Sequence, residues 1–194
     1  MAIVKQDHAA GLLTHLLGEL DADTNERALL HRILDTATPK ELIVADRNFR
    51  FTHLLLGIAE RGSFFVIRHH GHVKCHPSGS RHRVGKTDTG EVWEQRVRAG
   101  GRTLRMVVVV LNQPTTGGDT GIRLLTNSSS RQARGTVVAE VYRLRWRLES
   151  TFLEVTRSVP CESNTMGYPP AALLTFSLAL CACNALRVVQ RALE

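Results

Sequence analysis

The stretch ELIVADRNF, residues 41–49, decides how this chain can fold. Its apolar run is typical of a buried β-strand, yet the run ends in a bare carboxylate, Asp46, which Arg47 and Asn48 follow at once. A charge beside a core strand is costly unless it lies exposed at the strand's end, is paired, or binds a cation. Asp46 is therefore a candidate functional residue.

The segments around this strand predict a sheet covered by helices. Residues 49–62 predict a helix closed by Gly62, and residues 63–70, SFFVIRHH, predict a second buried strand. Upstream, residues 25–34 predict a helix, and residues 1–20 predict one or two short extended or mixed segments. Strand, helix and strand in this order, with apolar strands, are typical of a parallel or mixed sheet.

The predicted secondary structure changes twice more along the chain. Residues of about 71–130 form short β-rich runs between turn signals and read as a β-rich insertion. The chain then turns helical, first over 137–158 and again in a long apolar segment near its end. The prediction is an α/β fold: a mixed sheet with flanking helices and a β-rich insertion, in one domain over 1–194.

The charge of the chain points to a polyanionic partner. The amino-acid composition is ordinary for a globular protein, with 43% hydrophobic and 22% charged residues. The formal net charge, however, is +7. Residues 61–105 hold ten lysines and arginines against three acids, a surplus of seven that equals the net charge of the whole chain. A local basic excess suits nucleic acid or another acidic surface.

Cysteine spacing and the two ends of the chain indicate a reducing compartment and no membrane segment. The four cysteines have no framework spacing, and we expect free or buried thiols. The amino terminus lacks the pattern of a signal peptide. Residues 163–186 carry no charge, but two prolines open the apolar part and polar residues interrupt it, which favours a buried core helix over a membrane span.

The predicted helix from Val137 to Ser158 carries the most informative side chains. At 100° per residue, Tyr142, Arg145 and Glu149 fall on one arc, apart from the apolar face and the solvent face. The simplest alternative is that Arg145 and Glu149, four residues apart, form an ordinary surface ion pair. On spacing alone, the surface ion pair is the favoured interpretation.

Two motifs together resemble a known family. IVADRNF, followed about a hundred residues later by YRLRWRLE, resembles the catalytic half of bacterial insertion-sequence transposases with a D, D, E carboxylate triad, in the insertion sequence four group. That group carries Tyr, two residues, Arg, three residues, Glu, six residues, Lys. Tyr142, Arg145 and Glu149 match its first three members; Thr156 stands at the lysine position, and Arg157 beside it is the candidate substitute.

The resemblance implies specific roles for these residues. Asp46 becomes the second acid of the triad and Glu149 the third, and the β-rich segment becomes the insertion in a ribonuclease-H-like fold. The family's first acid sits in an Asp-Gly-Thr-like motif, and none of the seven acids before Asp46 lies in such a motif. The resemblance therefore predicts a carboxyl-terminal catalytic fragment, whose isolated chain is inactive because the first acid is missing.

The implied chemistry is cleavage and strand transfer by displacement at phosphorus, for which two Mg²⁺ ions, or Mn²⁺, are held by carboxylates such as Asp46 and Glu149. The implied partner is double-stranded DNA at transposon ends, with a homodimer expected in the synaptic complex, in the bacterial cytoplasm at the nucleoid. Membranes are not expected as partners. The candidate DNA-binding residues are Tyr142, Arg145, Arg157, Arg96, Arg98 and Arg105.

Other interpretations stay open at this point. The chain could be a catalytically inactive DNA-binding transposase remnant or an unrelated basic scaffold protein; metal-dependent cleavage and salt-dependent DNA binding separate the three. Residues 69–76, HHGHVKCH, have metal-ligand types but no second cluster at zinc-finger spacing, so a polar strand end near DNA is preferred to a zinc site. Trp93 and Trp146 could stack on bases, but core or strand packing is the preferred interpretation for each.

Overall fold

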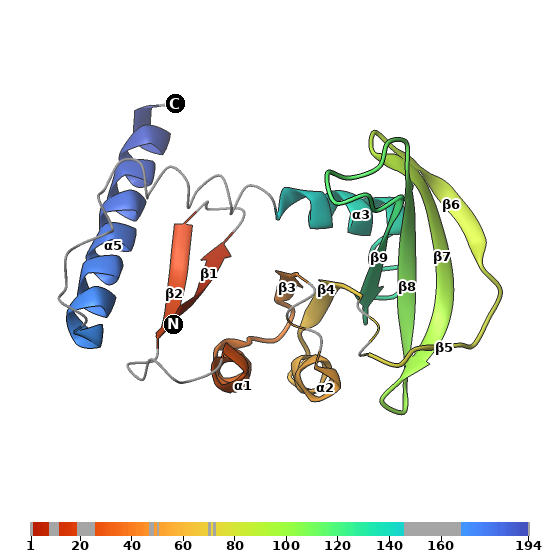
Figure 1. The fold of residues 1–194 in the computed structure, drawn as a ribbon, viewed down its shortest axis with the longest axis horizontal. Coiled ribbons are helices and arrows are strands. Elements are labelled where there is room, and N and C mark those ends of the chain that lie inside the picture. The colour runs from red at the N-terminus through yellow and green to blue at the C-terminus, as the bar shows by residue number, and fades with distance from the viewer. Residues whose placement is uncertain are drawn as a thin grey trace. The chain divides into compact units, whose positions relative to one another are not determined.

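The computed structural model describes residues 2–7, 12–18, 26–46, 49, 51–69, 71, 73–145 and 168–193. These residues fall into two compact units. One unit comprises residues 34–145, and the other comprises residues 1–33 and 146–194. Figure 1 shows the helices and strands of both units.

The unit of residues 34–145 is built on one seven-stranded sheet. Its strand order is β3-β4-β9-β8-β7-β5, with β6 paired to the edge of β7. Strands β3 and β4 run parallel, and the other pairs are antiparallel. The bounds are β3 Leu42–Ala45, β4 Phe64–Arg68, β5 His76–Pro77, β6 His82–Thr87, β7 Gly90–Ala99, β8 Arg102–Leu111 and β9 Gly121–Thr126.

The predicted strand, helix and strand around Asp46 are confirmed. Helix α2, Thr52–Glu60, connects β3 to its parallel neighbour β4. Gly62 follows the helix with φ +72°, the left-handed conformation that glycine adopts without strain. Its carbonyl accepts a hydrogen bond from the amide of Lys40, which ties the turn before β3 to the turn before β4.

The β-rich composition predicted for about 71–130 is also confirmed, because β5 to β9 lie in this range. These strands do not form a separate sheet: β9 pairs with β4, so they continue the sheet that β3 and β4 begin. The long β7–β8 hairpin turns at Gly100 and Gly101, both at positive φ, as a tight two-residue hairpin requires.

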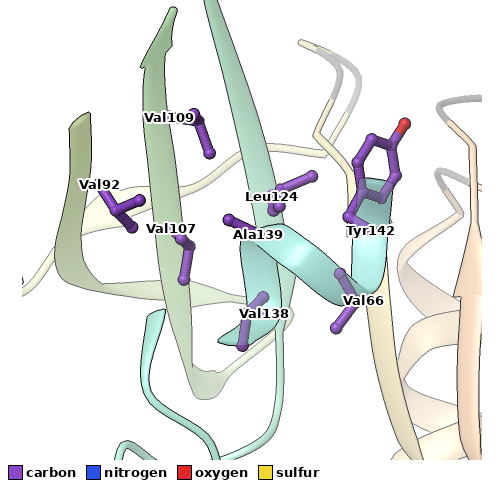
Figure 2. Packing of buried hydrophobic residues seen from close by; sticks show 8 residues of the cluster. All are labelled: Val66, Val92, Val107, Val109, Leu124, Val138, Ala139 and Tyr142. Carbon is purple, nitrogen blue, oxygen red and sulfur yellow. The ribbon is translucent and has the colours of Figure 1, made fainter. Parts of the chain in front are cut away.

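Helix α3, Gly135–Leu144, covers one face of the sheet. Val138, Ala139 and Tyr142 come from this helix, and they pack in one buried cluster with Val66, Val92, Val107, Val109 and Leu124 from the strands. Figure 2 shows these side chains, with the Tyr142 ring at the margin of the cluster and its hydroxyl directed away from the valines. The apolar spacing of 138, 139 and 142 is what fixes this face of the helix.

The opposite face of the sheet carries the other side chains of the same strands. Side chains alternate along a strand, so Phe65 and Ile67 point away from α3, and both are fully buried. Helix α2 packs on β4 and buries Leu54, Leu55 and Ile58. The central strands are therefore apolar on both faces, which explains their nearly continuous hydrophobic sequence.

The other unit contains a β-hairpin and a long helix. Strands β1, Ala2–Asp7, and β2, Leu12–Gly18, pair antiparallel, which agrees with the short extended segments predicted for residues 1–20. The side chain of Asn184, in helix α5 (Pro169–Leu193), accepts a hydrogen bond from the Leu13 amide and donates one to the Leu13 carbonyl, at 2.9 and 2.8 Å. Helix α1, Glu26–Thr36, crosses the boundary between the two units.

Helix α5, Pro169–Leu193, departs from its prediction. Sequence patterning favoured a buried core helix, and Ala179 and Leu180 are indeed buried. Its other apolar side chains are mostly exposed, however, including Leu174 and Leu178 at 61% each. The prediction is thus wrong for most of the helix surface, because its apolar residues surround the helix and the hairpin contact covers only part of them. By length and composition alone, residues 170–193 would be able to cross a membrane, which is weak evidence for a span.

Candidate functional site

Asp46 lies directly after β3, at the end of the sheet where the parallel strands finish. Its carboxylate is half-buried, and its carbonyl accepts a hydrogen bond from the Phe49 amide at 3.1 Å, which turns the chain away from the strand. Val44 packs against the cluster under α3, and alternation directs the side chain of Asp46 to the same face. The charge that the sequence leaves unexplained is therefore at a sheet edge.

Tyr142 brings the second motif to this carboxylate. Its hydroxyl donates a hydrogen bond to Asp46 Oδ1 at 3.2 Å, across 96 positions of sequence. The ring is 4% exposed and belongs to the core cluster, so α3 holds the hydroxyl by packing as well as by this bond. Burial and the negative charge of Asp46 raise the pKa of Tyr142 to about 12, while Arg145 and Arg68 oppose the shift. The hydroxyl is consequently a proton donor at neutral pH.

Two arginines accompany this pair. The Arg145 guanidinium carbon lies 5.6 Å from the centroid of the Tyr142 ring, a cation–π distance, at the point where α3 ends. Arg68 is the last residue of β4, and the register that pairs Ala45 with Ile67 sets it level with Asp46. Sequence reasoning predicted Arg145 and missed Arg68. The signal for Arg68 was available: like Asp46, it closes an apolar parallel strand, and the ends of such strands meet at one edge.

Glu149, the other residue predicted to be catalytic, has no described position. Glu149 and Arg157 lie outside the described residues, as do Trp146 and Cys161. The predicted helix of 137–158 is described only as far as Leu144, and its start agrees with α3. Among the described residues, then, the site contains Asp46, Tyr142, Arg145 and Arg68.

The three arginines predicted in the β-rich segment lie on one face of the β7–β8 hairpin but differ in exposure. Arg96 and Arg98 are exposed, and Arg96 lines a cavity of about 730 Å³. Arg105, directly opposite Arg96, is 8% exposed and donates hydrogen bonds to Glu94 and Ser128, each at 3.1 Å. Arg105 is thus part of a buried ion pair between β7 and β8.

The remaining sequence candidates have local contacts. A ring nitrogen of His69 is 2.9 Å from the Val73 carbonyl oxygen, and burial raises the pKa of the Cys75 thiol. Within the described part of the chain, which leaves out His70 and His72, no three metal-ligating side chains gather. Trp93 is half-buried under the Arg81 guanidinium, whose carbon lies 5.1 Å from the ring centroid.

The joining of the Asp46 and Tyr142 motifs agrees with a comparison of the whole sequence. A protein-family model described as a transposase DDE domain matches residues 3–184. The chain belongs to this transposase DDE domain family. No curated protein matches the chain. The mixed sheet with flanking helices is consistent with the ribonuclease-H-like fold of a DDE transposase.

Family membership settles the general chemistry. DDE transposase domains act on DNA and use divalent metal ions. Asp46 fits such an ion, because a carboxylate oxygen at an accessible sheet edge is the hard donor that Mg²⁺ and Mn²⁺ prefer. One carboxylate does not complete a metal site, and Asp46 is the only predicted metal ligand within the described residues.

Proposed function

We propose that this chain carries catalytic residues for DNA cleavage and strand transfer in insertion-sequence transposition, as a member of the insertion sequence four group. The observation that supports this proposal is the 3.2 Å bond between Tyr142 and Asp46. Residues of two motifs that identify the group meet at one sheet edge, although 96 positions separate them. An accidental match of either motif gives no reason for that meeting.

The proposed reaction is an in-line displacement at phosphorus. A hydroxyl oxygen attacks phosphorus and loses its proton to water, the bond between phosphorus and the leaving oxygen breaks, and the leaving oxygen takes a proton from water. Two divalent ions supply charge stabilisation of the attacking and leaving oxygens in such reactions. In this chain Asp46 and Glu149 would hold these ions, and the Tyr142 hydroxyl would fix the orientation of the Asp46 carboxylate.

The arginines have a separate role in the proposal. Arg145, at the end of α3, would bind a phosphate oxygen of the strand at the site, since guanidinium to phosphate bonds are charge-assisted. Arg96 and Arg98, exposed on the hairpin face, would contact the backbone of double-stranded DNA at transposon ends, and Arg157 would add a contact near Glu149. Arg105 would act indirectly, through the buried pair that keeps β7 and β8 in register.

We further propose that the 194-residue chain binds DNA without cutting it. None of the acids before Asp46 lies in an Asp-Gly-Thr-like motif, so the first acid of the family's triad is not assigned to any residue. Two carboxylates are too few to hold two metal ions firmly. The loss of a metal ligand removes charge stabilisation from the transition state. The site is proposed to work in the bacterial cytoplasm at the nucleoid, as a homodimer in the synaptic complex, over a catalytic domain of 1–194 with its insertion at about 71–130.

The test is a cleavage assay with Mg²⁺ or Mn²⁺ on DNA that carries the element's own ends. We expect the chain to bind this DNA without cutting, and a version extended upstream to include the first acid to cut it. Asp46→Asn in the extended version should abolish cleavage and leave binding intact. Metal-dependent cutting that survives Asp46→Asn would contradict the proposal, because Asp46 would then hold no essential ion.

A further inference from the structure

The ion pair between Arg68 and Asp119 links the proposed site to a distant turn. Arg68 Nη2 lies 2.6 Å from Asp119 Oδ2. The Arg68 side chain is 22% exposed and that of Asp119 is 48% exposed, so the pair faces solvent at the edge where Asp46 lies. The positive charge of Arg68 thus lies beside the Asp46 and Tyr142 pair. Its hydrogen bond, however, goes to the carboxylate of Asp119, in a different part of the chain.

Asp119 is presented by an ordered turn between β8 and β9. Its amide donates to Thr115 Oγ1 at 3.1 Å, and its carbonyl accepts from the Thr115 amide at 2.9 Å. Gly118 stands at φ +81°, which the turn requires and glycine permits. The chain returns to β9 directly after this turn, since the Leu111 amide donates to the Thr120 carbonyl. The carboxylate of Asp119 is therefore held toward Arg68 by the backbone around it.

A carboxylate and a phosphate compete for the same donors on a guanidinium. Both present oxygens that accept charge-assisted hydrogen bonds from its planar fork, and a phosphate carries more acceptor oxygens. An exposed ion pair is weak, because water and salt screen it. A phosphate at the Asp46 edge can consequently replace Asp119 as the acceptor of the Arg68 hydrogen bond. The negative charge of the freed Asp119 carboxylate would then repel that phosphate.

We propose that Arg68 binds a backbone phosphate of DNA at the Asp46 site and that Asp119 is its internal competitor, which occupies the guanidinium until DNA displaces it. This inference rests on the proposed function. It assigns a role to Arg68 that the two motifs do not include. It also makes the β8–β9 turn a determinant of affinity: each binding event must break the Arg68 to Asp119 bond before the new one forms.

The experiment measures binding of a double-stranded oligonucleotide by fluorescence anisotropy over a range of salt, without divalent metal. Asp119→Asn removes the competitor and keeps the shape of the side chain. We expect it to raise affinity about two- to fivefold, the range that an exposed ion pair covers. It should also steepen the dependence of log affinity on log salt by up to roughly one, because no carboxylate takes up a cation on binding.

Two comparisons isolate the Arg68 contact. In an Arg68→Gln background, Asp119→Asn should lose its specific effect, because the guanidinium it releases is gone. Glu60→Gln is the matched charge control: Glu60 pairs with Arg102 at 3.1 Å, an exposed pair at the opposite end of β8. This control changes the net charge by the same amount and also frees an arginine. Because that arginine lies at the opposite end of β8 from the Arg68 contact, the control should raise affinity less than Asp119→Asn does.

The possible results separate the two proposals. An equal effect of Asp119→Asn in both backgrounds, or an effect no larger than that of Glu60→Gln, overturns the competition and leaves DNA binding intact. Absence of salt-dependent binding in the wild type and all variants overturns the proposed function, and the competition with it. Correct folding of each variant is checked by circular dichroism, and Arg68→Met, which also removes the positive charge, replaces Arg68→Gln if the glutamine variant unfolds.

Discussion

Replacing Tyr142 by phenylalanine removes the hydrogen bond that joins α3 to the end of β3. The ring stays in the core cluster, so only the hydroxyl and its 3.2 Å bond to Asp46 are removed. Hydrogen bonds to charged groups contribute about 1.5–3 kcal/mol. The Asp46 carboxylate is half-buried, and water can replace the missing donor, so we expect the free energy of unfolding to fall by about 1–1.5 kcal/mol.

The reverse deletion should cost more. Asp46→Ala leaves the Tyr142 hydroxyl without its acceptor on a residue that is only 4% exposed, and a buried polar group without a partner costs about 1–3 kcal/mol. The double variant should therefore lose less than the sum of the two single variants, with a coupling of about 1 kcal/mol. The asymmetry between the two single variants follows from the difference in burial between the hydroxyl and the carboxylate.

Urea unfolding of the wild type, both single variants and the double variant, followed by circular dichroism, measures this coupling. Tyr168→Phe is the matched control, because Tyr168 is the other tyrosine of the chain and is 63% exposed. The control should unfold as the wild type does. Strict additivity of the two single variants would refute the reasoning, since it would mean that the hydroxyl and the carboxylate do not interact in solution.

Other parts of the structure give further predictions. Leu124→Ala, at a side chain with no exposed surface, should lower the free energy of unfolding by about 3–5 kcal/mol in urea titrations. Because the pKa of Tyr142 is raised to about 12, its stabilising contribution is complete below the usual tyrosine pKa of about 10 and is lost as pH rises through 12; the ultraviolet absorbance of tyrosinate, compared with Tyr142→Phe, checks this. Charge reversal at Arg96 and Arg98 should weaken DNA binding and flatten its salt dependence, by about 0.9 for each phosphate that the protein no longer neutralises, in anisotropy titrations. Arg105→Ala should instead destabilise the fold by about 3–5 kcal/mol in thermal unfolding, because it leaves a buried carboxylate without its partner.

The local architecture around Asp46 was predictable because its signals lie close together in sequence. An apolar run, a helix with its closing glycine at Gly62 and a second apolar run predict parallel strands, and β3, α2 and β4 follow. The meeting of Tyr142 with Asp46 also follows from the family pattern. Spacing alone could not give it, since a helix face says nothing about which strand the helix covers.

Long-range contacts were beyond the reach of sequence patterns. Arg105 reads as one more basic residue of a charged segment, and only the pairing of β7 with β8 brings it beside Glu94 and buries both. The bond between Arg68 and Asp119 likewise depends on the turn that returns the chain to β9. The burial expected for helix α5 is not found because hydrophobicity does not say how much of a helix its contacts cover; among the described residues, the contact with Leu13 covers a small part of the helix.

Iron-directed cleavage of the polypeptide tests directly whether Asp46 and Glu149 belong to one divalent-metal site. Iron(II) substitutes at carboxylate sites and, with ascorbate and peroxide, cuts the polypeptide beside the bound ion. We expect two cuts, next to Asp46 and next to Glu149, and therefore three main fragments by mass spectrometry. Excess Mg²⁺ should suppress both cuts, and Asp46→Asn should abolish both together. Cuts at the histidine and cysteine segment of residues 69–76, or cutting at Glu149 that persists in Asp46→Asn, would contradict one shared metal site.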